Sequence, residues 1–409
     1  MWDPAIVERG RVAPRRLALL QGALASLDRA FRERGGRLVI RRGDPAAEIA
    51  ALAAETGATE VHAHRDYTPF ARARFARVAA IPGVRLVLHA GTLLVEPEAI
   101  GESRVFSAFH RRWIEVDLRV AQDAPRRIAV PAGFSGEAVP ASTVDPQADA
   151  EGRLRAFASE AGLRYGADRD RLDLDGTSHL SAALHLGLIS PRRVAAAVDN
   201  EAFRRQLAWR DWASHLPWFR PATLQEGWDT AFRDAAWRDD ADALAAWHEG
   251  RTGYPTVDAA MRQLAAEGWI HNRARMIVAS FLAKDLLLDW RAGEAWFLRH
   301  LVDGDVANNS LGWQWTAGVG TDAAPYVRVL NPSLQGERFD PKGEWVRRWV
   351  PELRDVDARW IHRPWEAPDG APARDGYPAP LVDHSEARRR ALALHAAVGA
   401  ARRARLASR

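Results

Sequence analysis

Hydrophobic positions in the first 110 residues alternate between helical spacing and short strand-like runs. Apolar residues recur at helical spacing in RRLALLQGALASLDRAFRERGG (15–36), PAAEIAALAAETG (45–57) and ARARFARVAA (71–80). Between them lie the apolar runs RLVIRRGD (37–44), TEVHAHRD (59–66) and VRLVLHA (84–90), which read as strands. Helices that alternate with strands predict an α/β domain with a parallel sheet and crossover helices over residues 1–110.

The pattern changes twice further along the chain. Residues 111–150 are rich in Pro, Gly, Ser and Asp, and we interpret them as an interdomain linker that is longer than ordinary connections. From residue 151 strand signals vanish, and a large all-α domain is expected over 151–409. Its predicted helices cover 152–163, 178–188, 190–198, 201–216, 240–250, 256–268, 271–290 and 293–301, with a basic amphipathic helix over the tail from 384. We read this tail as a solvated terminal helix.

Composition narrows the functional classes. A hydrophobic content of 47% with 27% charged residues is typical of a soluble globular protein. The chain has no cysteine, which excludes disulfides, thiolate catalysis and cysteine-ligated metals. Neither a signal-peptide pattern nor an apolar run of about 18 residues is present, so a cytoplasmic location is expected.

Charge and aromatic content leave a nucleic-acid partner open. The net charge is only +4, but most of the 57 basic residues are arginine, whose planar guanidinium suits phosphate. Arginine bias is equally typical of proteins from GC-rich genomes, and that explanation is slightly favoured on composition alone. The 17 tryptophans outnumber 13 phenylalanines and 5 tyrosines, which suggests a use for indoles in stacking or redox chemistry.

The stretch DGTSHLSAALHLGLISPRR, from residue 175, is a candidate anion site. We expect Thr177 and Ser178 to cap the helix that follows, whose free amides would then bind phosphate oxygens. Tyr165 and Arg169 precede it and could cover a cofactor. Capped helix starts are common, so this signal alone is weak.

Two helices place polar and aromatic residues on one face. In WIHNRARMIVASF, Asn272, Arg275 and Met276 are spaced i, i+3 and i+4. A buried Arg275 needs an anion, for which Asp303 or Asp305 is the candidate, although an ordinary structural salt bridge would give the same pattern.

In RRQLAWRDW, Gln206, Trp209 and Arg210 have the same spacing. Trp209, and Trp315 of the GWQW motif, could stack flat ligands such as bases. Each tryptophan taken singly is more simply explained by core packing.

Together these motifs resemble one family. TSHLSAALHLGLISPR, WRDW, HNRARMIVASFLAKDLLLDW and DGDVANNSLGWQW are similar to the photolyase/cryptochrome family, and most like its class I cyclobutane pyrimidine dimer photolyases. The resemblance covers most of the chain from about residue 11. It implies an α/β domain with a parallel Rossmann-like sheet, lacking the family's first strand, followed by a large all-α FAD-binding domain.

The resemblance implies light-driven DNA repair. Reduced, anionic FAD would absorb blue light and pass an electron to a pyrimidine dimer flipped out of the duplex. Asn309 would face flavin N5, where a neutral amide is compatible with an anionic ring, and Arg275 would pair with Asp303. The positions that match flavin-binding residues are Tyr165, Thr177, Ser178, His179, Leu180, Ser181, Phe203, Asn272, Arg275, Asp303, Gly304, Asp305 and Asn309.

The same resemblance implies a lesion pocket and an electron relay. Trp209 and Trp315 would form aromatic walls of the pocket. Trp313, Trp290 and Trp237 match the family's relay, which carries electrons from the surface to oxidised flavin. The positions that match DNA- or lesion-contacting residues are Arg169, Gln206, Trp209, Arg210, Asn272, Arg273, Met276, Trp315, Arg328, Gln335 and Arg338. No metal is implied, and a monomer is expected.

The chain departs from the family pattern in ways that affect the predictions. Gln206 replaces the usual glutamate and is also found in (6-4) photolyases, whereas Met276 stands where (6-4) enzymes carry histidine. We therefore predict dimer repair, with (6-4) repair or a cryptochrome-like photoreceptor as alternatives. RDYTPFARARF (65–75) occupies the antenna region without the glutamate expected for folate, so an 8-hydroxydeazaflavin-type antenna, or none, is favoured.

Overall fold

The structure, a computed structural model, describes residues 1–8, 12–133, 135–233, 235–322, 327–368 and 376–407. The chain divides into two compact units, and each is assembled from segments that lie far apart in the sequence. The first unit comprises Met1–Gly166, Thr177–Pro221 and Leu301–Asn308, and the second comprises Ala167–Gly176, Ala222–His300 and Asn309–Arg409. These units follow internal packing, and the domain boundaries expected near residues 110 and 150 stay a prediction.

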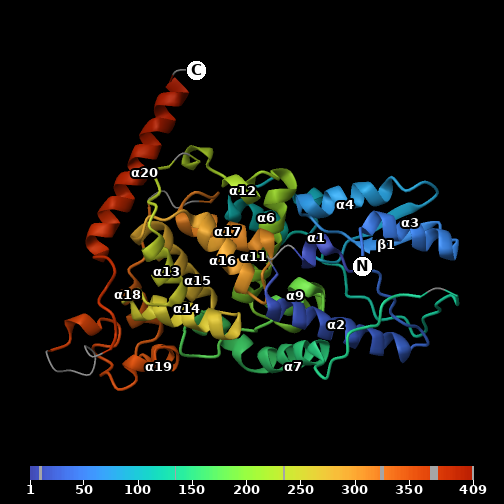
Figure 1. The fold of residues 1–409 in the computed structure, drawn as a ribbon, viewed down its shortest axis with the longest axis horizontal. Coiled ribbons are helices and arrows are strands. Elements are labelled where there is room, and N and C mark those ends of the chain that lie inside the picture. Colours follow the sequence, from blue (N-terminus) through green and yellow to red (C-terminus); the bar gives the residue numbers. More distant parts are fainter. Residues whose placement is uncertain (9–11, 134, 234, 323–326, 369–375, 408–409) are drawn as a thin grey trace. The chain divides into compact units, whose positions relative to one another are not determined.

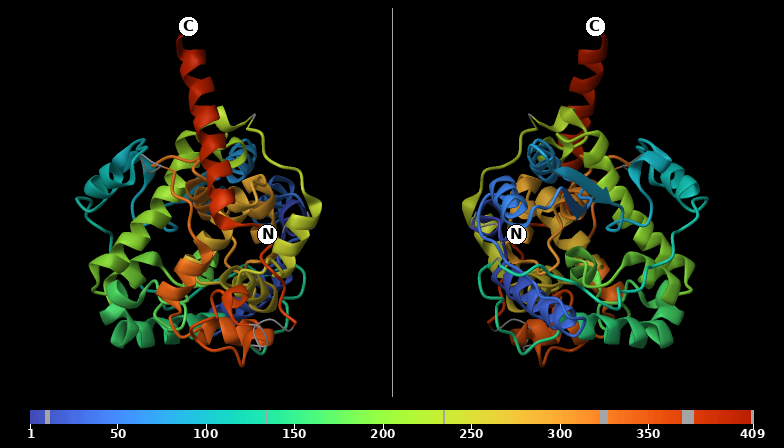
Figure 2. Two further views of the ribbon diagram at one scale, coloured as in Figure 1. Left: turned by 90° about the vertical axis from the view of Figure 1, so that its left-hand side faces the viewer. Right: turned by 90° about the vertical axis from the view of Figure 1, so that its right-hand side faces the viewer.

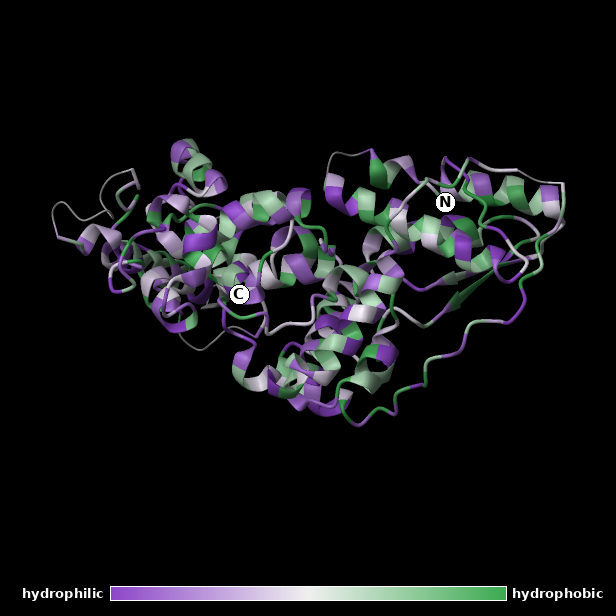
Figure 3. Cartoon of the chain, turned by 90° about the horizontal axis from the view of Figure 1, so that it is seen from below, coloured by the Kyte–Doolittle hydropathy of each residue, from purple (hydrophilic) through white to green (hydrophobic). Residues whose placement is uncertain are grey.

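The first unit contains the expected parallel sheet. Strands β1 (Glu60–His64) and β2 (Arg85–His89) pair in parallel, with Glu60 opposite Arg85. Helix α4 (Pro69–Ala79) connects them and packs against β2, and the right-hand view of Figure 2 shows both strands as arrows. Hydrophobic residues colour part of this sheet green in Figure 3. The prediction of an α/β region with a crossover helix is confirmed.

The predicted strand over residues 37–44 is wrong as a regular element. Its residues make only two single bridges among the described residues, Ile40 with Glu137 and Arg42 with Trp2. A strand forms a ladder only where an extended neighbour runs beside it for several residues. The apolar run is therefore correct as extended backbone, but tertiary pairing does not extend it into a strand.

Capping residues explain where the helices of this unit begin and end. Asp44 accepts a hydrogen bond from the backbone N–H of Ala47, and Pro45 occupies the first turn of α3 (Pro45–Thr56). Gly57, with φ of 70°, ends that helix in the left-handed conformation that glycine tolerates best. The sequence signals predicted these boundaries to within a residue.

The predicted linker separates two helices. Between α6 (Phe106–Trp113) and α7 (Pro146–Ser159) the described residues form no helix and only an isolated bridge at Glu137. Helix α7 packs against α2 (Pro14–Arg32), as Figure 1 shows. The other elements of the first unit are α1 (Pro4–Val7), α5 (Pro97–Ile100), η1 (Ala161–Arg164), α8 (Tyr165–Asp168, whose last two residues belong to the second unit), α9 (Ser181–Leu186), α10 (Pro191–Ala197) and α11 (Glu201–Phe219).

Helix α14 (Pro255–Glu267) forms the centre of the second unit. It packs against α13 (Ala241–Glu249), α15 (Asn272–Ser280), α18 (Pro332–Phe339) and α19 (Glu344–Trp349), and nine of its residues are buried. The remaining elements of this unit are α12 (Thr223–Glu226), η2 (Thr230–Phe232), the π-helix η3 (Phe281–Asp285), α16 (Trp290–His300), α17 (Val306–Ala317, which begins in the first unit), η4 (Pro351–Leu353), η5 (Pro364–Glu366) and α20 (His384–Ala407). The all-α reading of this region is confirmed.

The C-terminal segment forms the expected long basic helix. In α20, Ala387 and Ala391 are fully buried against the second unit, whereas Arg388 and Arg389 are exposed. Figure 3 shows hydrophilic and hydrophobic residues together on the helices, the distribution expected of amphipathic elements. Within the described part of the chain, no helix is long and apolar enough to cross a membrane.

Candidate functional site

Both units carry residues that the sequence singled out. Those in the first unit are Tyr165, Thr177, Ser178, His179, Leu180, Ser181, Phe203, Gln206, Trp209, Arg210, Asp303, Gly304 and Asp305. Those in the second are Arg169, Trp237, Asn272, Arg273, Arg275, Met276, Trp290, Asn309, Trp313, Trp315, Arg328, Gln335 and Arg338. The predicted site residues are thus divided between the two units.

A short acidic loop precedes α17 in the first unit. Asp305 accepts hydrogen bonds from the backbone N–H and the side-chain amide of Asn308, at 2.7 and 2.9 Å, and lies 3.2 Å from His185 Nδ1. Burial alone would raise the pKa of Asp305, but His185 and Asn308 outweigh burial and hold that pKa well below its usual range. Asp305 is therefore an anion at any physiological pH, with His185 as its partner.

Arg16 of α2 reaches the same loop. Its Nη1 donates to the carbonyl oxygens of Leu301 and Gly304, at 2.9 and 3.2 Å, and the residue is only 9% exposed. No sequence pattern linked Arg16 to Leu301, which lies 285 positions further along the chain. The predicted pairing of Arg275 with Asp303 stays a prediction.

The Thr177–Ser181 segment differs from its expected form. Helix α9 begins at Ser181, and its N-cap residue is Leu180, which makes no side-chain capping bond, so capping by Thr177 or Ser178 is wrong. Ser178 Oγ instead accepts from the N–H of Leu180, and His179 has φ of 50°. A local side-chain bond thus supports a turn here, and the left-handed backbone of a non-glycine residue is typical of sites where function constrains the chain.

Two predicted cofactor residues lie in one aromatic cluster. Tyr165 and Phe203 are buried and meet edge to face with ring centroids 5.2 Å apart, and Phe157 packs on both. Asn200 caps α11 through the N–H of Phe203 and donates to Gly162 O, which ties the start of α11 to η1. The sequence prediction placed Tyr165 and Phe203 in one site, and the structure brings them into contact.

Helix α11 presents the predicted pocket residues. Trp209 is half-buried, and its ring stacks on Phe106 with centroids 3.7 Å apart and planes 11° from parallel. One face of Trp209 is therefore already covered by Phe106. Gln206 donates to the carbonyl of Ala202 on its own helix, and Arg210 donates to the carbonyls of Thr92 and Leu184. Arg210 thus connects α11 to the segments that carry Thr92 and Leu184, a structural role that the sequence did not indicate.

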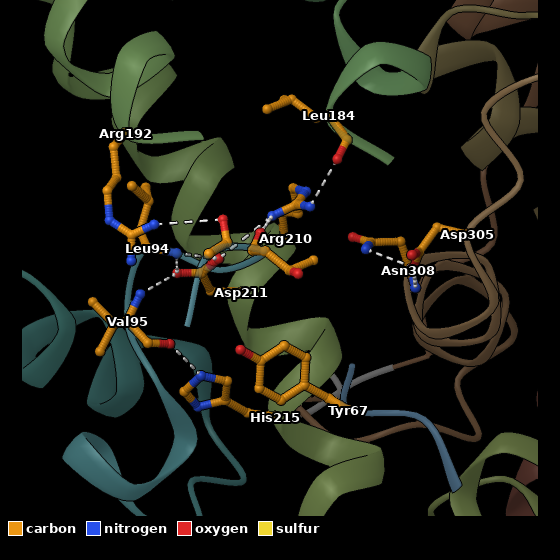
Figure 4. Close-up of polar contacts among 12 residues, drawn as sticks. Tyr67, Leu94, Val95, Leu184, Arg192, Arg210, Asp211, His215, Asp305 and Asn308 are labelled. Atoms are coloured by element: carbon orange, nitrogen blue, oxygen red, sulfur yellow. Dashed lines mark hydrogen bonds and ion pairs between the residues drawn. The ribbon is translucent and has the colours of Figure 1, made fainter. Parts of the chain in front are cut away.

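Asp211 fixes α11 from its buried side. Its carboxylate accepts from the N–H groups of Leu94 and Val95, both at 3.0 Å, and from Trp113 Nε1 at 2.9 Å. Figure 4 shows these backbone contacts with the neighbouring Arg210. Burial raises the pKa of Asp211 to about 6, although Arg210 and the three donors oppose that rise.

In the second unit, Glu294 orients Asn309. Asn309 Nδ2 donates to both the backbone O and the side-chain Oε1 of Glu294, each at 3.0 Å. Because these bonds hold the NH₂ end, the carbonyl oxygen is the end that can accept from a ligand N–H. The acceptor role expected for Asn309 toward flavin stays a prediction.

The three predicted relay tryptophans belong to neighbouring segments. Trp313 is 2% exposed, and its ring leaves no room for a side chain on Gly293, whose Cβ would fall 2.1 Å from Trp313 Cη2. Gly293 lies one turn beyond Trp290 on α16. The residue after Trp237 bridges to Leu288, two residues before Trp290. Trp313 also meets Phe297 and Trp247 edge to face, at 5.0 and 6.1 Å.

Helix α15 confirms the predicted common face. Asn272 Nδ2 contacts Met276 Sδ at 3.8 Å, as the i, i+4 spacing requires. Arg275 Nε donates to Ile270 O. Arg273, a predicted DNA contact, pairs with Asp170 at 2.9 Å and lies over the Phe339 ring.

The remaining predicted DNA contacts lie in and before α18. Lys284 of the π-helix is buried and donates to the backbone carbonyl of Arg328 at 2.6 Å, which anchors the segment that carries this arginine. Arg338 is exposed, and Gln335 Oε1 is buried with no hydrogen-bond partner among the described residues. The Nε1 atom of Trp315 is also buried and has no hydrogen-bond partner among the described residues. Such atoms are expected where a ligand completes the hydrogen bonding.

The sequence missed the residues that support this site. Arg16, Phe106, Asp211, Lys284 and Glu294 each hold a predicted functional residue or its loop. Glu294 and Asn309 are only 15 residues apart, yet no helical spacing links them. The one sequence signal for such residues is a charged residue within an apolar segment, as at Arg16 and Lys284, because a charge that becomes buried needs a partner.

The residues present fit FAD better than a metal. No group of three or more His, Asp or Glu side chains that could hold a metal ion occurs among the residues the structure describes. The first unit instead offers an ionised carboxylate and buried aromatic rings, and the second unit offers an oriented amide acceptor. Groups of these kinds suit a flavin nucleotide.

Comparison with known proteins decides the family. Residues 1–129 match the family described as DNA photolyase, and residues 203–397 match the FAD binding domain of DNA photolyase. The chain is 43% identical over 417 residues to the deoxyribodipyrimidine photo-lyase of Streptomyces griseus, covering 95% of this chain and 90% of the relative. The chain belongs to the DNA photolyase family. The resemblance stated from the motifs is thereby confirmed.

Solved structures of the family share its fold. The crystal structure of a class III photolyase from Agrobacterium tumefaciens is similar with a TM-score of 0.88 and 37% identity, covering 95% of this chain and 89% of that one. An archaeal photolyase from Sulfolobus tokodaii, solved with two FAD molecules, is similar with a TM-score of 0.83 and 28% identity, covering 96% and 91%. The predicted combination of an α/β domain and a helical FAD-binding domain is confirmed.

Proposed function

We propose that this protein is a deoxyribodipyrimidine photo-lyase, which repairs cyclobutane pyrimidine dimers in DNA under blue light. The observation that carries the proposal is the 43% identity to a photo-lyase of that name over 95% of the chain. The polar and aromatic side chains described above support it, because each predicted role falls on a residue of suitable chemistry. A cytoplasmic location, a monomeric state and membership of class I stay predictions.

The cofactor is held by residues of matching chemistry. FAD, when bound in its reduced form, supplies a light-absorbing electron donor. Asn309 offers an acceptor for a flavin N–H, while Asp305 stays ionised beside His185. Tyr165 and Phe203 supply an apolar aromatic surface. Trp237, Trp290 and Trp313 provide side chains that can be oxidised transiently, and we propose that they return the cofactor to its reduced form.

The lesion is recognised by stacking and by polar edges. We propose that a flipped-out dimer stacks on the face of Trp209 that Phe106 does not cover. Gln206, Asn272 and Met276 would contact its edge. The exposed Arg328 and Arg338 would meet phosphates of the strand.

Light-dependent repair tests the proposal directly. The reduced protein is illuminated with one oligonucleotide that contains a cyclobutane dimer and, separately, with one that contains a (6-4) photoproduct. Restoration of the pyrimidines in the first only, and only in the light, is the expected result. Repair of the (6-4) lesion alone would reassign the substrate, and binding without repair of either lesion would contradict an enzymatic function.

Replacement of Trp209 by alanine is expected to weaken binding of dimer-containing DNA. Loss of one base-stacking surface costs about 1–3 kcal/mol, or roughly 5- to 150-fold in affinity. Affinity is measured with a dimer-containing and an undamaged oligonucleotide, since only the former should be affected. Trp218→Ala is the matched control, because Trp218 lies on the same helix but packs against Arg65 and Arg72. An equal loss in both variants would argue against a pocket at Trp209.

Replacement of Asn309 by aspartate is expected to lower the midpoint potential of bound FAD. A carboxylate here would lose both bonds to Glu294 and add negative charge beside an anionic ring, at a cost on the order of 1–3 kcal/mol. Asn331→Asp is the control, because Asn331 caps α18 and aspartate caps helices equally well. An unchanged potential in Asn309→Asp would place this residue away from the flavin.

We propose an antenna chromophore of the 8-hydroxydeazaflavin type rather than folate. The region around Arg65 and Tyr67 lacks the glutamate expected for folate within residues 65–75. The Tyr67 hydroxyl donates to Glu96 at 2.8 Å, which orders this segment. An absorption band of the purified protein beyond those of flavin, in the violet, would support the antenna, and flavin bands alone would argue against it.

A further inference from the structure

We propose that Arg16 is a positioning residue of the FAD site, which clamps the 301–305 loop so that Asp303 and Asp305 keep the orientation and charge that the cofactor requires. This inference rests on the proposed binding of FAD at these carboxylates. Arg16 lies in α2 and is distant in the sequence from every motif that carries the family resemblance. It therefore adds a functional residue that belongs to none of those motifs.

One guanidinium nitrogen closes the loop. Arg16 Nη1 donates to Leu301 O and Gly304 O, and the N–H of Gly304 also donates to Leu301 O at 3.3 Å. Leu301 and Asp303 are 1% and 7% exposed, so water has little access to this turn. A buried carbonyl oxygen requires a donor from the protein, and Arg16 is a donor for both of these.

The shape of Gly304 is matched to Arg16. A Cβ on Gly304 would fall 1.9 Å from Arg16 Nη1 and 3.2 Å from Leu301 O, so no other residue fits while Arg16 holds this position. The glycine between the two aspartates is thus explained by the approach of the arginine. Arg16 and Gly304 therefore depend on each other structurally, although 288 positions separate them in the sequence.

Charge supports the same role. Burial lowers the pKa of Arg16, while the negative charges of Asp303 and Asp305 raise it. The loop would otherwise concentrate two carboxylates where an anionic reduced cofactor binds, and like charges repel at short range. Arg16 offsets that repulsion from the protein side, so its loss affects both the geometry and the electrostatics of cofactor binding.

The test compares Arg16→Met, Arg16→Lys and Gly304→Ala with Arg15→Met, which changes the exposed arginine next to it. The dissociation constant of FAD, the rise in melting temperature on adding FAD, and the midpoint potential of bound FAD are measured for each. In Arg16→Met we expect the dissociation constant to rise about 10- to 100-fold, the value for losing hydrogen bonds to a charged group. Gly304→Ala should change it in the same direction, and Arg15→Met should not.

The conservative variant separates charge from geometry. Arg16→Lys keeps the positive charge but lacks the guanidinium. Its midpoint potential should therefore equal that of the parent protein, whereas its affinity for FAD should lie between those of the parent and Arg16→Met. A dissociation constant in Arg16→Met equal to that of Arg15→Met overturns the inference, as does an equal loss of melting temperature with and without FAD. If Arg16→Met does not fold, parental affinity and potential in Gly304→Ala overturn it. A parent protein that binds no FAD overturns the proposed function instead.

Discussion

Replacement of Trp313 by phenylalanine is expected to slow photoreduction of oxidised FAD by at least about 100-fold, equivalent to about 2.7 kcal/mol of added barrier. An indole can be oxidised transiently, whereas a phenyl ring at the same place cannot. The change should preserve the fold, because Trp313 Nε1 has no hydrogen-bond partner among the described residues and the smaller ring keeps the apolar contacts with Phe297 and Trp247. Repair by chemically reduced enzyme should be nearly unchanged.

The measurement is the rate of flavin bleaching under blue light with an external electron donor. Trp345→Phe is the matched control: Trp345 is buried to the same degree, at 3% exposed, and its Nε1 donates to Gln263. Trp290→Phe and Trp237→Phe should also slow photoreduction if all three residues act in series. Photoreduction in Trp313→Phe at the rate of the control would exclude Trp313 from the relay.

Replacement of Asp211 by alanine is expected to lower the free energy of unfolding by about 3–5 kcal/mol, a large part of the typical stability of a domain. Alanine would leave the N–H groups of Leu94 and Val95 and the indole N–H of Trp113 buried without their acceptor. Asp211→Asn is the matched control, since an amide oxygen in place of Oδ2 keeps an acceptor for these donors. Denaturant unfolding measures both, and equal stability of the two variants would contradict the network.

The difference in stability between the wild type and Asp211→Asn is expected to depend on pH. Burial raises the pKa of Asp211 to about 6, so the folded state binds its proton more tightly than the unfolded state, where the pKa is about 4. The part of the stability that comes from protonation of Asp211 is therefore complete below about pH 4 and is lost as the pH rises to about 6. The wild type should lose stability relative to Asp211→Asn over this range, by at most about 1.4 kcal/mol per pH unit. Parallel stability curves would show that Asp211 does not titrate there.

Local patterns predicted most of the elements and their type. The helices α2, α3, α4 and α11 and both strands of the sheet lie where apolar spacing and capping signals placed them. Motif resemblance gave the family and a set of predicted site residues without any structure. Both succeed because helical and strand periodicity, and short motifs, are properties of neighbouring residues.

Two local signals did not lead to the structure that they predicted. Residues 37–44 look like a strand, but among the described residues they form only single bridges, because no long extended segment there pairs with them. Thr177 and Ser178 look like helix caps, but the segment instead turns on the bond between Ser178 and the N–H of Leu180. Arg210 donates to two backbone carbonyls, and its predicted contact with DNA stays a prediction.

By itself, the sequence of this protein determined most of the elements, the family and the chemical type of each predicted site residue. Only the tertiary structure decided which side chains already have partners within the protein. Arg16 bonds to the 301–305 loop, Asn309 bonds to Glu294, and one face of Trp209 is covered by Phe106. Segments distant in the sequence meet through burial, which acts on the whole chain, and a buried polar group then bonds to whatever partner lies there. Local spacing contains no record of that partner.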